Sequence, residues 1–233
     1  MRMPLSGLEE ARLIERVNRF VARIIWRGEE VVCHVPNTGR MRELMFPNAK
    51  LGVLPYPEDG RATRCKLVLV QRDGEWVCIE SVLANRFMEL LLQSGEADFG
   101  PVQDLCREVP LDGSRLDISY RTGERRTWME VKCCTLVEGG HARFPDAPTV
   151  RGAKHLRELV AVRQRGEEAI AAFLVTRHAV DFTANAATDP HFARALLQAH
   201  RAGVAVRAFA CHVELDGIQW LGEIPCLIKE EWA

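Results

Sequence analysis

Short hydrophobic runs separated by turn-forming residues dominate the first third of the chain. Four of these runs form two pairs, each around a turn: Phe20–Trp26 with Val31–Val35, and Lys66–Val70 with Trp76–Ser81. The second turn contains Asp73-Gly74, a strong signal for a β-hairpin. Several short strands at close spacing predict a small β-barrel in this part of the chain.

Residues 10–25 have a pattern that fits two kinds of element. Apolar residues follow helical spacing at Leu13, Val17, Phe20, Val21 and Ile24, and arginines occupy the opposite side at positions 12, 16, 19 and 23. The β-branched residues Val21, Ile24 and Ile25 beside a hairpin favour strands instead. The local pattern therefore leaves helix and strand both open.

Helical and strand patterns alternate after about residue 82. Helices are predicted at Asn85–Ser94, Gly152–Arg165 and, after the capping pair Asp189-Pro190, up to Ala202. Strands are predicted at Asp104–Pro110, Ser114–Arg121, Arg126–Leu136, Ala169–Arg177 and Val204–Val213. This alternation predicts an α/β layer structure, and we place the domain boundary between residues 82 and 83.

The charge of the chain is almost balanced, with 31 Lys and Arg against 32 Asp and Glu in 233 residues. Any contact with nucleic acid must therefore come from a local basic patch. None of the eight cysteines falls in a C-x-x-C pair, so we expect reduced, buried thiols. No stretch approaches the roughly 18 apolar residues of a membrane helix. We expect a cytoplasmic protein without membrane contact.

A predicted hairpin in the second part carries the most informative chemistry. If Gly123-Glu124 is a two-residue loop of type II′, the numbers of paired residues sum to 247. Asp117 then lies opposite Glu130, and Arg115 opposite Lys132, on one face of the hairpin. Two opposed carboxylates repel each other unless a cation lies between them.

A divalent cation would remove this repulsion, and hard oxygen ligands favour Mg²⁺ or Mn²⁺ over zinc. Lys132 could then position the attacking water or neutralise the charge that develops on a phosphate. This combination suits phosphodiester hydrolysis. The alternative is an exposed hairpin whose charges are merely solvated, because alternating acidic and apolar residues are typical of any half-exposed strand.

Five segments of the chain have the same order as the motifs of a known family. They are His34-Val35-Pro36-Asn37-Thr38-Gly39-Arg40-Met41, Ser114-Arg115-Leu116-Asp117, Glu130-Val131-Lys132, Phe144-Pro145-Asp146-Ala147 and the run from Thr149 to Leu159. Together they closely resemble the sugar fermentation stimulation protein A family of bacteria and archaea. The resemblance extends from about Arg12 to Leu227.

The resemblance implies an N-terminal OB-fold barrel (residues 1–82) followed by a PD-(D/E)xK nuclease-like α/β domain (residues 83–233). It also implies strands over residues 10–25, association with DNA and a link to the regulation of sugar utilisation. Asp117 and Glu130 match the metal-binding acids of the nuclease pattern, and Lys132 matches its lysine. Glu108 and Glu89 match further acidic positions, with Glu108 as an added metal ligand.

Several polar residues are candidates for contact with DNA. They are His34, Asn37, Arg40 and Arg42 in the barrel, with Thr38 in the same loop, and Arg115, Arg151, Lys154 and His155 in the second domain. The alternative for Arg151, Lys154 and His155 is a solvated helix face, and the alternative for Arg40 and Arg42 is contact with the second domain. Asp146 is expected to shape the turn that contains it, and Asp189 to cap a helix.

Three functions remain open at this point. The first is a Mg²⁺- or Mn²⁺-dependent nuclease in which Asp117, Glu130 and Lys132 are catalytic. The second is a DNA-binding regulator of sugar metabolism with a site that has lost its activity. The third is a hydrolase of a small phosphorylated metabolite. The sequence leaves open the DNA substrate, single- or double-stranded, and any homo-oligomer.

Overall fold

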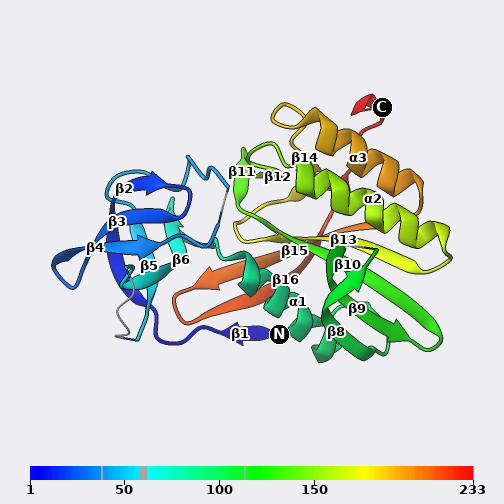
Figure 1. Cartoon of the computed structure of the whole chain (residues 1–233), viewed down its shortest axis with the longest axis horizontal. Helices are drawn as coiled ribbons and strands as arrows, with labels where there is room; N and C mark the ends of the chain where they lie inside the picture. Colours follow the sequence, from blue (N-terminus) through cyan, green and yellow to red (C-terminus); the bar gives the residue numbers. More distant parts are fainter. Residues whose placement is uncertain (38, 58–61, 113, 233) are drawn as a thin grey trace.

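The computed structural model describes residues 1–37, 39–57, 62–112 and 114–232. Thr38, in one of the family motifs, lies outside the described residues, as does part of the loop after residue 57. Two units lie side by side, a β-barrel and a larger α/β domain (Figure 1). Among the described residues, no helix is both long and apolar enough to cross a membrane.

The first unit is the OB barrel that the sequence predicted. Its strands are β2 (Glu9–Asn18), β3 (Val21–Trp26), β4 (Glu29–His34), β5 (Lys50–Pro55), β6 (Cys65–Arg72) and β7 (Glu75–Cys78). Antiparallel pairs run β4-β3-β2-β5-β6-β7, and a parallel pairing of β4 with β6 closes the barrel. The Asp73-Gly74 turn has positive φ at both residues, as a type I′ hairpin requires.

Residues 10–25 are strands, and two irregularities explain why their pattern resembles a helix. The register between β2 and β3 shifts after Leu13 and again after Arg16. Each shift interrupts the strict alternation of buried and exposed side chains. Leu13 and Ile24 are buried as a result, whereas Val17 and Phe20 are exposed.

A seven-stranded mixed sheet forms the centre of the second unit. Its order is β1-β16-β15-β13-β10-β9-β8, with β10, β13 and β15 parallel. These strands are β1 (Arg2–Pro4), β8 (Gln103–Leu111), β9 (Ser114–Thr122), β10 (Arg125–Cys134), β13 (Glu168–Val175), β15 (Ala205–Glu214) and β16 (Gly217–Ile224). The predicted strands of this part are confirmed, whereas β1 and β16 had no clear sequence signal.

Helices cover both faces of this sheet. They are α1 (Ser81–Ser94), α2 (Val150–Gln164) and α3 (Pro190–Arg201), with a short 3-10 helix η1 (Glu230–Trp232) near the end. Helix α1 packs in one hydrophobic core, and α2 and α3 share the core on the opposite face. In Figure 1 α2 and α3 lie together on one side of the sheet and α1 on the other.

A small second sheet extends the domain beside β10. Its strands are β11 (Leu136–Glu138), β12 (His141–Phe144), β14 (Asp181–Ala184) and β17 (Cys226–Leu227). The loop after β12 leads through Asp146 to Thr149, the N-cap of α2. This loop faces the barrel, so the small sheet brings the Phe144–Ala147 motif to the junction of the two units.

The barrel packs directly against the α/β domain. Val68, Leu69 and Cys78 of the barrel share a hydrophobic core with residues of α1 and the large sheet. All eight cysteines are free thiols. Five of them are buried as predicted, but Cys106 is exposed because it lies on β8 at the edge of the sheet.

Candidate metal and nucleic-acid site

The β9–β10 hairpin has the register that the sequence predicted. The observed pairs run from Arg125 with Thr122 to Met129 with Ile118, and each pair sums to 247. Gly123 has φ of 60°, as the first position of a type II′ turn requires. A two-residue loop therefore places Asp117 and Glu130 at the first positions beyond the last pair.

The two strands separate at this point, and the side chain of Asp117 takes over a backbone bond. Its Oδ2 accepts a hydrogen bond from the backbone N–H of Val131 at 2.8 Å, and its Oδ1 accepts one from Asn85 of α1 at 2.8 Å. The predicted pairing of Arg115 with Lys132 is absent from the described ladder, which ends at Ile118 and Met129. The hairpin thus opens into a fork with Asp117 inside it.

The carboxylate of Asp117 lies in a strongly perturbed environment. Burial raises its pKa to about 6, with a further contribution from the negative charge of nearby Glu130. The hydrogen bond from Val131 and the charge of Lys132 offset part of this shift. Two neighbouring carboxylates repel each other when both are ionised, so this arrangement favours either a proton shared between them or a bound cation.

Glu130 is 3% exposed and is held on one oxygen only. Its Oε1 contacts both Nζ of Lys132 and Nδ1 of His155, whereas its buried Oε2 has no hydrogen-bond partner among the described residues. Burial alone would raise the pKa of Glu130, but the hydrogen bond from His155 and the charge of Lys132 lower it below its ordinary value. An ionised carboxylate with a bare, buried oxygen is the usual donor for a cation.

A helix residue fixes the orientation of Glu130. Arg151 donates from Nε to Nε2 of His155 at 3.3 Å, so Nε2 is the acceptor and Nδ1 carries the proton. His155 therefore donates from Nδ1 to Glu130, and the three side chains form a chain from the surface to the buried site.

His155 was predicted to contact DNA, but it is 4% exposed and points inward. The signal for this burial was present in the sequence, because His155 shares the helix face of Gly152, Leu156 and Leu159. Arg151 and Lys154 are exposed at the start of α2, and Lys154 pairs with Glu158 at 3.4 Å.

Glu108 does not join Asp117 and Glu130. It is exposed and its carboxylate lies 3.5 Å from Nη1 of Arg115. Over the part of the chain that the structure describes, no three His, Cys, Asp or Glu side chains come together as a metal-binding group. Glu89 of α1 pairs with Arg107 at 3.1 Å. The geometry therefore gathers two acids, Asp117 and Glu130, with Lys132.

The four barrel residues that were predicted to bind DNA differ from one another in their contacts and exposure. Asn37 is structural, because its Nδ2 donates to the carbonyl of Ile79 at 2.7 Å and its Oδ1 accepts from Gly39 at 2.8 Å. His34 lies 3.0 Å from the hydroxyl of Tyr56. Arg40 and Arg42 are exposed.

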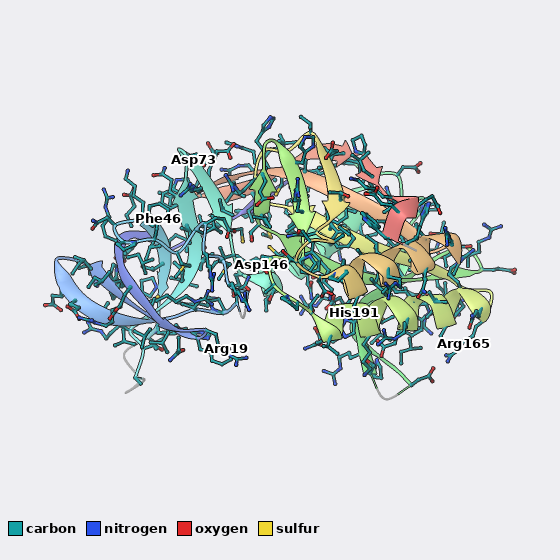
Figure 2. All side chains as sticks on the ribbon, turned by 90° about the horizontal axis from the view of Figure 1, so that it is seen from above. Arg19, Phe46, Asp73, Asp146, Arg165 and His191 are labelled. Atoms are coloured by element: carbon teal, nitrogen blue, oxygen red, sulfur yellow. The ribbon has the colours of Figure 1, made fainter. Side chains whose placement is uncertain are left out.

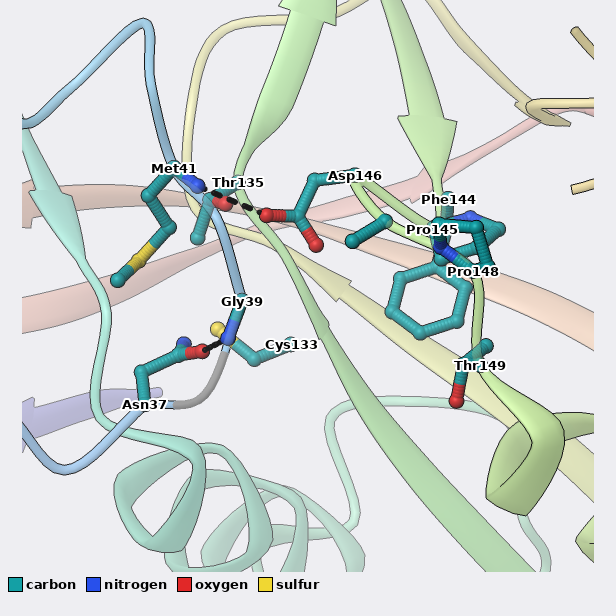
Figure 3. A pocket seen from close by; sticks show the side chains of 11 residues that line it. Asn37, Gly39, Met41, Cys133, Thr135, Phe144, Pro145, Asp146, Pro148 and Thr149 are labelled. Atoms are coloured by element: carbon teal, nitrogen blue, oxygen red, sulfur yellow. Dashed lines mark hydrogen bonds between the residues drawn. The ribbon is translucent and has the colours of Figure 1, made fainter. Parts of the chain in front are cut away.

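A cavity of about 200 Å³ lies where the barrel meets the second domain (Figure 3). Asp146 projects into it and accepts a hydrogen bond from the backbone of Met41 at 2.9 Å. Asp146 therefore connects the two units, in addition to its place in the predicted turn. Cys133 and Thr149 line the same cavity, next in sequence to Lys132 and at the start of α2.

Asp189 is a helix cap, as predicted, and it serves two helices. Its Oδ1 accepts from the backbone of Phe192 in α3 at 2.9 Å, and its Oδ2 accepts from the backbone of Thr149 at 2.7 Å. The first turns of α2 and α3 are thus fixed to each other beside the cavity.

An OB barrel joined to a restriction-endonuclease-like α/β domain is the class of protein that this architecture defines. Family models for the SfsA N-terminal OB domain and for the sugar fermentation stimulation protein RE domain match residues 14–79 and 82–217. The chain belongs to the sugar fermentation stimulation protein family.

Relatives match the chain over nearly its whole length. A sugar fermentation stimulation protein homolog of Acetivibrio thermocellus is 41% identical and covers 97% of this chain and 100% of its own. A homolog of Methanobrevibacter smithii is 37% identical over 88% of this chain and 90% of its own. The structure of Pyrococcus furiosus SfsA in complex with Ca²⁺ is similar with a TM-score of 0.89 and 29% identity, covering 98% and 100% of the two chains.

Proposed function

We propose that this protein acts on DNA and hydrolyses phosphodiester bonds with a divalent cation. The observation that carries this proposal is the fork of the β9–β10 hairpin. Asp117 and Glu130 lie there together, Lys132 contacts one oxygen of Glu130, and the other oxygen is buried with no partner in the part of the chain that the structure describes.

The residues of the fork fit a hard cation. Asp117 and Glu130 would hold it through carboxylate oxygens, and Mg²⁺ and Mn²⁺ prefer such ligands and keep several waters. The Pyrococcus furiosus relative was solved in complex with Ca²⁺, which supports binding of a divalent ion. A bound cation supplies Lewis-acid polarisation of a phosphate oxygen.

The chain's own residues would position the substrate and balance its charge. The ammonium group of Lys132 lies at the fork and would orient the attacking water or stabilise negative charge on the phosphate. His155 keeps Glu130 in place from α2. Arg151 and Lys154, exposed on the same helix, would contact the phosphate backbone.

Incubation with end-labelled single- and double-stranded DNA and either Mg²⁺ or Mn²⁺ tests this proposal. We expect cleavage that chelation abolishes, and a rate for Lys132→Ala about 100-fold lower, as for the loss of one electrostatic group. Lys229→Ala is the control, because Lys229 is exposed near the end of the chain. Cleavage by Lys132→Ala at the parental rate would exclude catalysis by this site.

A DNA-binding regulator without catalysis is the second candidate. It is favoured by the occupied Oε1 of Glu130 and by the position of Glu108 away from the fork. Binding would then persist in chelator and weaken with salt as phosphate contacts do. A structure with Mn²⁺ at the fork, or any metal-dependent product, would exclude this candidate.

A further inference from the structure

An exposed aromatic ring stands on the turn between β2 and β3. Phe20 is 49% exposed and forms the two-residue turn together with Arg19. The turn is rigid, because the carbonyl of Phe20 accepts from the backbone of Val35 at 2.7 Å and its N–H donates to Asn18 at 2.8 Å. A ring held in this way can stack on a base without a large loss of conformational entropy.

A basic groove begins beside this ring. It encloses about 360 Å³ and is lined by Arg16, Asn18, Arg19, Gly39, Arg40 and Arg42. The guanidinium carbon of Arg19 lies 5.6 Å from the centre of the Phe20 ring. Among the described residues, Arg19, Arg40 and Arg42 have no carboxylate within ion-pair distance. Their charges are therefore available to phosphates.

Arg16 fixes the shape of the groove. Its guanidinium donates only to backbone carbonyls, those of Asn18, Arg19, Asn37, Gly39 and Arg40. It thereby joins the turn that carries Phe20 to the loop that carries Arg40. Because no carboxylate of the described residues accepts a hydrogen bond from Arg16, its positive charge also adds to the field of the groove.

The groove borders the cavity between the two domains. Gly39 lines both the groove and the cavity between the domains, and that cavity extends to Cys133 and Thr149. In Figure 2 Arg19 lies on the edge of the barrel nearest to the second domain, and Asp146 lies between the two domains. A strand that follows the groove would thus reach the residue next to Lys132 and the start of α2.

We propose that this groove binds a single-stranded nucleic-acid segment, with a base stacked on Phe20 and phosphates on Arg19, Arg40 and Arg42. The inference rests on the proposed function and defines its substrate class, a strand or end with unpaired bases. Duplex DNA does not meet the requirement, because the faces of its bases are already stacked on one another and cannot reach Phe20.

Binding of labelled single-stranded and blunt duplex DNA of equal length, in chelator, tests the groove. We expect Phe20→Ala to weaken binding of the single strand roughly 5- to 100-fold, the range for loss of one stacked base, and to leave duplex binding within about twofold. Arg19→Ala should reduce the salt slope for the single strand by about 0.7, as for one lost phosphate contact. Comparison with an RNA strand of the same length shows whether the groove prefers DNA or RNA.

Two exposed residues far from the groove provide matched controls, Leu221→Ala for the ring and Arg125→Ala for the charge. Equal loss for single strand and duplex with Phe20→Ala, or no loss at all, would overturn the inference. The proposed function is tested separately by Asp117→Asn in the cleavage assay. Cleavage that depends on Asp117 but not on the groove would leave the proposed function intact and refute only this inference.

Discussion

Replacement of His155 isolates the part of the site that orients Glu130. His155→Phe removes the N–H that Nδ1 donates to the buried carboxylate, and it leaves Lys132 as the single donor to Oε1. A hydrogen bond to a charged, buried group contributes about 1.5–3 kcal/mol. Loss of such an outer partner lowers metal affinity roughly 10- to 100-fold, which corresponds to about 1.4–2.8 kcal/mol. We therefore expect Mn²⁺ to bind His155→Phe one to two orders of magnitude more weakly.

His155→Asn gives the decisive comparison. The asparagine amide occupies the position of Nδ1 and can still donate to Glu130, but it has no atom at the position of Nε2, which accepts from Arg151. We expect His155→Asn to bind Mn²⁺ within about threefold of the parent, a difference below one hydrogen bond.

Calorimetric titration with Mn²⁺ measures both variants, and far-UV circular dichroism checks that they fold. His191→Phe makes the same change at an exposed histidine of α3 and should have no effect. Parental affinity in His155→Phe would refute the reasoning, as would an equal loss in the two variants of His155.

Two further predictions concern the fork and the domain junction. The raised pKa of Asp117 means that the folded state retains a proton which the unfolded chain loses above about pH 4, so ionisation costs stability as pH rises from about 4 to 6. The shift from 3.8 to about 6 corresponds to about 3 kcal/mol. In urea unfolding without metal, the stability of Asp117→Asn relative to the parent should therefore increase between pH 4 and pH 8. A difference in unfolding free energy that stays constant over this pH range would contradict the prediction. A Cβ on Gly39 would lie 2.8 Å from Oδ2 of Asp146, so Gly39→Ala should cost about 1–3 kcal/mol in thermal unfolding. Adding Asp146→Ala should recover part of this cost, and strictly additive losses would show that the two positions are independent.

The register of the β9–β10 hairpin could be predicted because a two-residue turn fixes every pair that follows it. Gly123-Glu124 alone determined which residues face each other as far as Ile118 and Met129. The separation of the strands beyond that point could not be predicted. There Asp117 accepts hydrogen bonds from Val131 and from Asn85, and Asn85 reaches it from a helix 32 residues earlier in the chain.

Side-chain direction accounts for most of the remaining differences. The burial of His155 could have been predicted from the apolar helix face that it shares with Leu156 and Leu159, but its contact with Glu130 could not, because it depends on how α2 packs on the sheet. Glu108 has a positive φ of 51°, a backbone conformation that no local pattern indicated. Phe20 was expected among apolar residues of regular spacing, but it lies in the turn between β2 and β3, where it is exposed.

The three-residue strand β1 changes how the barrel is attached to the rest of the chain. Its residues pair with β16 in the large sheet, and the polypeptide returns to that sheet's domain through α1 after the barrel is complete. The chain therefore connects the barrel to the α/β domain at both of its ends, before β2 and after β7, and not through a single linker. Two connections permit little rotation of one unit about the other. A nucleic-acid strand that lies across the junction would therefore meet two surfaces at a fixed spacing.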